Sequence, residues 1–161
     1  MEEMFIKIGA WTLCRVAESL VKKVDKPDQS DPPLALICKL RTDRANKAHV
    51  DVKIWNNKNY EINVSPVKFD LEKRHNGRVK KMRLNKINVD FTTQAEGMNN
   101  REKITIPAND FQVLSFSPEA LISCLEIADE ASNGDYVLRP FIVVGGNEIH
   151  SSSAVSASKN V

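Results

Sequence analysis

The sequence predicts an α+β fold: mainly an antiparallel β meander of about seven strands, with one helix near the N-terminus and one in the C-terminal half. Short runs of alternating apolar and polar residues recur along the chain, as in half-buried strands. An Asn-Gly pair separates two of these runs, which is typical of a tight hairpin. Two longer segments repeat their apolar residues with helical spacing. A chain of 161 residues suits one core, so we expect one domain over residues 1–150 and a polar, flexible tail over residues 151–161.

The first helix is expected to begin after Thr12, a residue type that caps helix N-termini. Its apolar stripe repeats at intervals of three and four residues: Leu13, Val16, Ala17, Leu20, Val21 and Val24. Prolines and acids in residues 26–33 end the helix. The apolar run Met4–Ile8 before it fits either a first strand or an extra helical turn.

Four further segments have the alternation of half-buried strands. They are Leu34–Leu40, Val50–Ile54, Lys103–Ile106 and Phe111–Phe116. The segment from Tyr136 to Val144 is instead almost continuously apolar and rich in β-branched residues, which favours a central strand.

The best-defined prediction is a hairpin that turns at Asn76-Gly77, because both central residues of a type I′ turn need positive φ. That turn places four apolar pairs face to face: Leu71–Met82, Phe69–Leu84, Val64–Val89 and Ile62–Phe91. It also opposes Glu72 to Lys81 and Asp70 to Arg83, which are pairs of opposite charge.

The apolar residues of this hairpin change face between its base and its distal half, near Ser65-Pro66 and Asn85-Lys86. Two paired bulges would restore one continuous face. Alternatively, the distal half presents its apolar side to the opposite face of the sheet.

The second helix is predicted after Ser117, which caps it, with Pro118 at the first helical position and Asn133-Gly134 closing it. Its buried stripe contains Leu121, Cys124, Leu125 and Ala128. The glycines of Gly145-Gly146 follow a strand without dinucleotide-binding spacing, so they predict a turn.

The net charge of +2 conceals a strong asymmetry. Residues 39–86 hold 14 lysines and arginines against 5 acids, a net charge of +9, whereas residues 104–161 hold 2 against 7, a net charge of −5. Segregated charge of this kind concerns partners and association rates rather than fold.

The composition also bears on where the protein resides. No apolar run approaches the roughly 18 residues that a membrane-spanning helix needs. The opening MEEMFIKIGAW lacks the basic region of a secretory signal. The odd cysteine count (Cys14, Cys38, Cys124) favours buried thiols in a reducing compartment, so we expect a cytoplasmic protein.

The candidate binding site is the basic end of the hairpin. Its cationic residues lie within eleven positions: Lys73, Arg74, His75, Arg78, Lys80, Lys81 and Arg83. A β-ribbon of this kind can enter a nucleic-acid groove or contact a phosphate backbone. Arg41, Arg44, Lys47, Lys53 and Lys58 would widen the patch if they shared its face. The alternatives are an edge hairpin that lysines and arginines keep soluble, and a contact with a protein or an anionic membrane.

A second candidate surface is acidic and is expected at the C-terminal end of the second helix. It comprises Glu126, Asp129, Glu130 and Asp135. Acids there oppose the helix dipole, and the basic surface of another copy would offset that cost. A solvated acidic face is the simpler interpretation.

The remaining reactive residue types suggest no chemistry. His49, His75 and His150 are scattered, and no histidine or cysteine has metal-ligand spacing, so neither a metal nor a cofactor is expected. Trp11 and Trp55 are either core anchors of a second layer or interface anchors.

The sequence therefore favours a non-enzymatic intracellular protein that binds the backbone of RNA or DNA through the basic hairpin. Self-association into a homo-oligomer, as in a viral or phage structural or accessory protein, fits the complementary charges. The alternative is a protein–protein interaction module, such as an adaptor, inhibitor or immunity factor. An enzyme is the weakest hypothesis.

Overall fold

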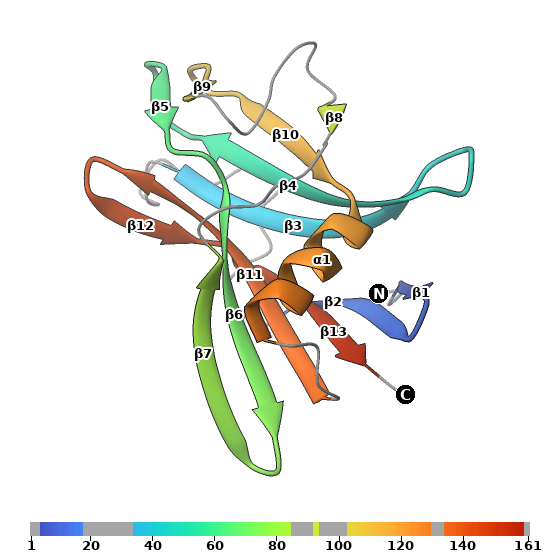
Figure 1. Cartoon of the computed structure of the whole chain (residues 1–161). Helices are drawn as coiled ribbons and strands as arrows, with labels where there is room; N and C mark the ends of the chain where they lie inside the picture. The colour runs from blue at the N-terminus through green and yellow to red at the C-terminus, as the bar shows by residue number, and fades with distance from the viewer. Residues whose placement is uncertain (1–3, 18–33, 85–91, 94–102, 130–133, 160–161) are drawn as a thin grey trace.

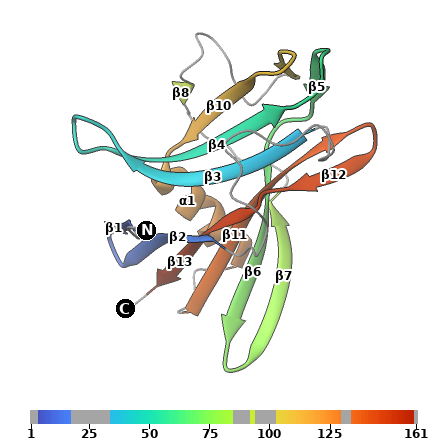
Figure 2. The ribbon, with the colours of Figure 1, turned by 180° about the vertical axis from the view of Figure 1, so that it is seen from behind.

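The computed structural model describes residues 4–17, 34–84, 92–93, 103–129 and 134–159, which form mostly antiparallel β-sheet with one short helix. Figures 1 and 2 show two main sheets that cross one another, with the helix beside them. The antiparallel prediction is confirmed, whereas the α+β description fits only roughly because strands dominate.

The larger sheet has seven strands in the spatial order β1–β2–β13–β11–β6–β7, and β12 also pairs with β11. Its strands are β1 (Phe5–Ile8), β2 (Trp11–Ala17), β6 (Lys68–His75), β7 (Arg78–Leu84), β11 (Gly134–Val144), β12 (Asn147–His150) and β13 (Ser153–Lys159). The predicted central strand is confirmed, since β11 lies between β13 and β6. The basic strand β7 lies at one edge.

The second sheet has four strands in the order β3–β4–β10–β8. Its strands are β3 (Leu34–Thr42), β4 (Ala48–Asn56), β8 (Thr92–Thr93) and β10 (Phe111–Phe116). A separate pair is formed by β5 (Ile62–Val64) and β9 (Ile104–Ile106). The four alternating segments that the sequence predicts as strands are confirmed as β3, β4, β9 and β10.

The core lies between the inward faces of these sheets. Leu36, Val52 and Ile54 of the second sheet are buried together with Tyr136 and Leu138 of the larger one. Across the interface, the rings of Phe69 and Phe116 meet edge to face with their centroids 5.7 Å apart, a geometry that aromatic pairs prefer.

The helix α1 (Pro118–Asp129) begins as the sequence predicts. The backbone carbonyl of Ser117 accepts hydrogen bonds from the amides of Ala120 and Leu121. Leu121 and Leu125 of its predicted stripe are buried in the core. Gly134 does not close the helix; it begins β11.

The predicted helix after Thr12 is wrong in its described part, because Trp11–Ala17 forms β2. This strand pairs with β1 on one side and with β13 on the other. Trp11 and Leu13 are buried with strand alternation. Hydrogen bonding to a strand on each side therefore outweighs the helical spacing of the apolar residues. Of the two alternatives for Met4–Ile8, the structure shows the strand, β1. The remainder of that prediction, residues 18–24, lies outside the described residues.

The predicted flexible tail is also wrong. Residues 153–159 form β13, which is paired on both sides, with β2 and β11. Ala154, Val155 and Ala157 are fully buried. The Ser153 hydroxyl donates to the Cys38 carbonyl and accepts from the Cys38 amide, which joins this strand to the second sheet. The small residues of β13 therefore allow close contact with the second sheet and are not there to face solvent.

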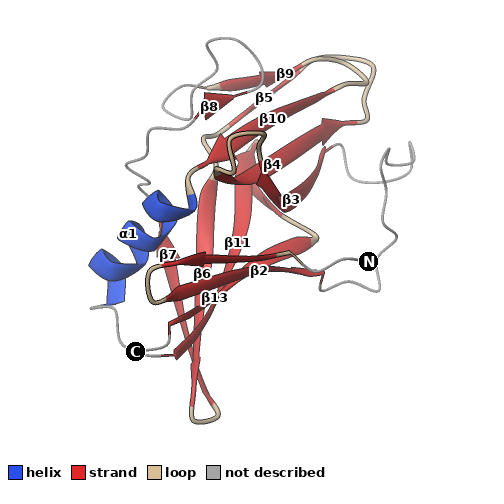
Figure 3. Ribbon diagram, turned by 90° about the vertical axis from the view of Figure 1, so that its right-hand side faces the viewer, coloured by secondary structure: helices blue, strands red, loops and turns tan. Residues whose placement is uncertain are grey.

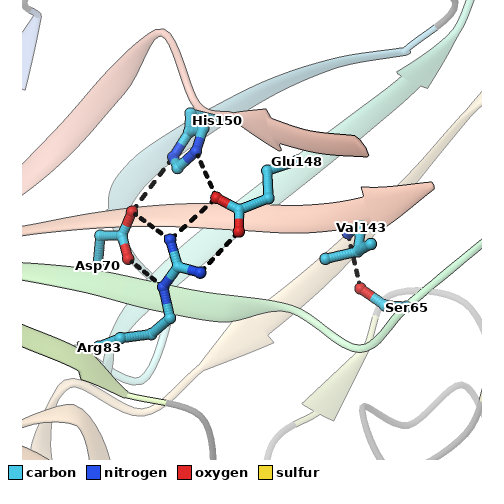
Figure 4. Close-up of polar contacts among 6 residues, drawn as sticks. All are labelled: Ser65, Asp70, Arg83, Val143, Glu148 and His150. Carbon is cyan, nitrogen blue, oxygen red and sulfur yellow. Dashed lines mark hydrogen bonds and ion pairs between the residues drawn. The ribbon is translucent and has the colours of Figure 1, made fainter. Parts of the chain in front are cut away.

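The base of the predicted hairpin is described on one of its two strands. Ile62 pairs with Ile106 and Val64 with Ile104, so β5 belongs to a different pair of strands. The predicted partners Val89 and Phe91 lie outside the described residues. Neither predicted alternative explains the change of face at Ser65-Pro66, because β5 ends at Val64 and β6 begins at Lys68. Ser65 contacts β11 instead, where its hydroxyl accepts from the Val143 amide (Figure 4).

The described part of the chain contains no helix that is both long and apolar enough to cross a membrane.

Candidate nucleic-acid interface

The distal hairpin folds as predicted. Asn76 and Gly77 have φ values of 51° and 74°, as a type I′ turn requires. The register opposes Leu71 to Met82, Lys73 to Lys80 and His75 to Arg78. The turn extends beyond the other elements of the larger sheet, at the bottom of Figures 1 and 3. The tip is therefore accessible to a large ligand.

The register divides the cationic residues between two faces of the ribbon. Residues that face each other across the strands lie on one side, and successive residues alternate. Lys73, His75, Arg78 and Lys80 therefore share a face, which we call the basic face. It continues the side that carries the buried Phe69 and Leu71.

The opposite side, the mixed face, carries both acids of the hairpin together with its other cations. Its charged residues are Lys68, Asp70, Glu72, Arg74, Lys81 and Arg83. The guanidinium of Arg74 forms an ion pair with Glu72 at 3.3 Å. Neither acid of the described hairpin strands lies on the basic face.

Arg83 is held by two carboxylates. It donates to Asp70 at 2.8 Å and to Glu148 of β12 at 2.6 Å (Figure 4), while its guanidinium lies 4.3 Å from the centre of the Phe141 ring. Hydrogen bonds from Arg83 lower the pKa of Glu148, and the same bonds, with those to Asp70, raise the pKa of Arg83. Arg83 therefore ties β7 to β12, whereas the sequence predicts it as a phosphate contact.

The imidazole of His150 completes this network. Its nitrogens lie 3.4 Å from Asp70 and 3.3 Å from Glu148, and its ring stacks on Phe141. A pocket of about 450 Å³ opens beside it on the mixed face. Residues from four strands line the pocket: Asp70, Leu71, Glu72, Lys81, Met82, Arg83, Val137, Arg139 and His150.

Six of the seven predicted site residues are exposed. They are Arg74, His75, Arg78, Lys80, Lys81 and Arg83. Lys73 is half-buried, and its ammonium lies 5.5 Å from the centre of the Tyr136 ring, so that ring fixes its direction. The structure brings four of the seven together on one face and commits Arg74 and Arg83 to ion pairs on the other.

Of the predicted acidic surface at the helix end, the structure describes the side chain of Asp135. Asp135 lies in β11, opposite Arg74 of the hairpin, and accepts a hydrogen bond from the Ser158 hydroxyl. It belongs to the larger sheet because β11 begins at Gly134. The side chains of Glu126 and Asp129 and the whole of Glu130 lie outside the described residues.

The flanking cations do not widen the hairpin patch. Arg41, Arg44, Lys47 and Lys53 belong to the β3–β4 hairpin of the second sheet, whose loop is well separated from the β6–β7 turn in Figure 1. Lys58 follows β4 in the next turn. Arg41 pairs with Asp51, whose hydrogen bond raises the pKa of the guanidinium.

The histidines and cysteines form no metal site among the described residues. His49 lies 2.8 Å from Asp43, and that hydrogen bond is the main cause of the lowered pKa of this carboxyl. Cys38 is fully buried, and burial raises the pKa of its thiol to about 11, so it is inert at neutral pH.

Glu148 was missed as a partner of the hairpin, and nothing in the local sequence indicates it. The contact depends on β12, which returns along β11 after the Gly145-Gly146 turn. That turn was predicted, but the strand after it was not. Trp11 proves to be a core anchor, because it is 4% exposed and packs against Tyr136.

Comparison with known proteins leaves the function open. No family model matches the sequence, and no curated protein is significantly similar to it. Among solved structures, the Northeast Structural Genomics Consortium target SoR45 is 12% identical with a TM-score of 0.35, over 75% of this chain and 81% of that one. A protein from Archaeoglobus fulgidus is 12% identical with a TM-score of 0.28, over 80% of this chain and 95% of that one. Neither likeness supports a functional argument.

Proposed function

We propose that this protein is a non-enzymatic, intracellular binder of polyanions that contacts the backbone of RNA or DNA through the basic face of the β6–β7 hairpin. The observation that supports it is the sorting of charge on the ribbon. Lys73, His75, Arg78 and Lys80 lie together, while the acids Asp70 and Glu72 lie on the reverse side.

This arrangement concentrates positive charge on one side of the ribbon, where an anion could bind. Lys73 faces Lys80 directly across the two strands. His75 and Arg78 are the next pair toward the turn. A phosphate backbone that lies along this face would neutralise several charges at once and release its own counterions.

The contact should be weakly specific for sequence. The hairpin tip carries cations and no phenylalanine, tyrosine or tryptophan, so it offers mainly charge to phosphates. The projecting ribbon also fits the dimensions of a groove, which accepts a two-stranded β-ribbon.

The Arg83 network beside the pocket on the mixed face joins β7 to β12, because Arg83 donates to Glu148 and lowers the pKa of that carboxyl. We interpret the network as a structural link between strands rather than as catalytic machinery.

The test is charge reversal of the triple set Lys73→Glu, Arg78→Glu and Lys80→Glu. We expect loss of binding to a short duplex oligonucleotide at about 50 mM salt, with an unchanged thermal unfolding curve, because these side chains lie beyond the core. The matched control reverses Lys7, Arg44 and Lys47, which are exposed on β1 and on the loop between β3 and β4, and it changes the net charge by the same amount.

Binding by the wild type that both variants lose equally would show that net charge, not the basic face, is responsible. A wild type that does not bind the duplex would contradict the proposal. Self-association through complementary charge stays a prediction, which light scattering after size-exclusion chromatography at low and high salt would test.

A further inference from the structure

We infer that the outer face of the four-stranded sheet is a second, base-stacking site for single-stranded nucleic acid, centred on Trp55 and Phe111. These two residues are neighbours on β4 and β10, the two central strands of that sheet. Their side chains point away from the core, because the alternate residues Ile54 and Leu114 are buried.

The two rings form a continuous aromatic surface. Their centroids are 4.8 Å apart with an interplanar angle of 52°. Phe111 is 38% exposed and Trp55 is half-buried. Ala35 of β3 lies beside Trp55 on its other side, so small and apolar residues flank the rings.

A cation is already placed on this surface. The ammonium of Lys53 lies 4.6 Å from the centre of the Trp55 ring and 4.2 Å from that of Phe111. A lysine can exchange such a contact for a phosphate, because an exposed cation–π contact is weak. A base could then take its place on the rings while the ammonium neutralises the adjoining phosphate.

The rest of the face supplies groups that can contact a strand. Ile37 and Val113 flank Lys53 on the neighbouring strands. Beyond them, the Asp51 carboxylate accepts hydrogen bonds from the Arg41 guanidinium and the Ser115 hydroxyl. These residues form a polar cluster next to Lys53 along the sheet. Aromatic side chains on adjacent central strands with lysine beside them are the elements by which an open sheet stacks successive bases.

The occupant follows from this chemistry. A duplex hides the faces of its bases, so an open aromatic surface gains from single strands only. A small hydrophobic molecule would not use the lysine, whereas a nucleotide uses both the rings and the lysine. The site is distinct from the basic face of the hairpin, which lies in the other sheet. It therefore does not depend on the proposed function.

The experiment uses the fluorescence of Trp55. The chain has two tryptophans, so Trp11→Phe leaves Trp55 as the only one. This background is titrated with short oligothymidylate and with an abasic oligomer of equal length, which has the same phosphates and no bases. We expect oligothymidylate to quench the fluorescence of Trp55 and to bind more tightly than the abasic oligomer, which should cause no quenching.

Substitution then assigns the effect to the rings. Trp55→Leu and Phe111→Leu should each weaken oligothymidylate binding by roughly 5- to 150-fold and leave binding of the abasic oligomer unchanged. Phe5→Leu is the matched control, because Phe5 is an exposed aromatic residue on β1 of the other sheet, 63% exposed. Thermal unfolding identifies any variant that fails to fold, and the quenching assay on the folded Trp11→Phe protein stands without those variants.

Equal affinity for the two oligomers, or an unquenched Trp55, would overturn the inference. A change in oligomeric state caused by Trp55→Leu, with nucleic-acid binding unaffected, would also overturn it and assign the surface to a protein contact. Either result leaves the hairpin proposal intact, because the abasic oligomer still reports binding to phosphates.

Discussion

The hairpin turn offers the sharpest structural prediction, because Gly77 has a φ of 74° and no atom within 4 Å of where its Cβ would be. Gly77→Val therefore meets no steric clash with neighbours, and its cost is the backbone strain alone. An L-residue in this conformation costs about 1–2 kcal/mol, and a β-branched residue is at the upper end.

That cost converts to a shift in melting temperature. Unfolding entropy of about 2.1 cal/mol/K per residue gives about 0.34 kcal/mol/K for 161 residues. The Tm of Gly77→Val should therefore fall by about 3–6 °C in calorimetry. Asn76→Gly is the control, because glycine accepts the φ of 51° at that position, and its Tm should change much less.

The same substitution should weaken oligonucleotide binding, because a distorted turn separates Arg78 from Lys73 and Lys80 on the basic face. Binding is measured by fluorescence anisotropy well below the Tm. A Gly77→Val protein with wild-type Tm and wild-type affinity would refute the assignment of a left-handed turn at this position.

Three further outcomes are expected. Since Arg83 lowers the pKa of Glu148, their link stabilises the fold above the ordinary carboxyl pKa of 4.5 and is lost as pH falls through the lower folded value. The Tm difference between wild type and Glu148→Gln should therefore be largest near pH 7 and vanish in acid. A difference that stays constant with pH would contradict the link. Deletion of residues 153–161 should abolish cooperative unfolding in circular dichroism, because β13 is paired on both sides, whereas a folded deletion protein would support the flexible tail. Cys38 should resist a thiol reagent at pH 8 in the native protein and react after denaturation, and rapid native labelling at that residue would contradict its burial.

Local signals predicted the elements that local chemistry determines. The Asn76-Gly77 turn fixes the register of the distal hairpin, and Ser117 with Pro118 fixes the start of α1. Both depend on residues within a few positions of each other.

The errors arise where distant strands decide the outcome. Leu13, Val16 and Ala17 have helical spacing, but β13 and β1 pair with that segment and make it a strand. Residues 153–159 are small and polar enough to resemble a tail, and only their position between β2 and β11 gives them a structure. No spacing within either segment carries that information.

The candidate site shows the same division. The sequence predicts the cluster of cations near the turn. It does not predict the ion pair between Arg83 and Glu148, because that contact depends on the position of β12. The pairing of Trp55 with Phe111 depends on the contact of β4 with β10, whose residues are far apart in the chain.

The most direct test of the central claim is the salt dependence of oligonucleotide binding. If Lys73, Arg78 and Lys80 contact phosphates, the logarithm of the binding constant should fall with the logarithm of salt concentration with a slope of at least about −2 to −3. Substitution of all three by glutamine should reduce that slope by about this amount and leave the Tm unchanged. An unchanged slope in the triple variant would contradict the claim that the basic face is the binding surface.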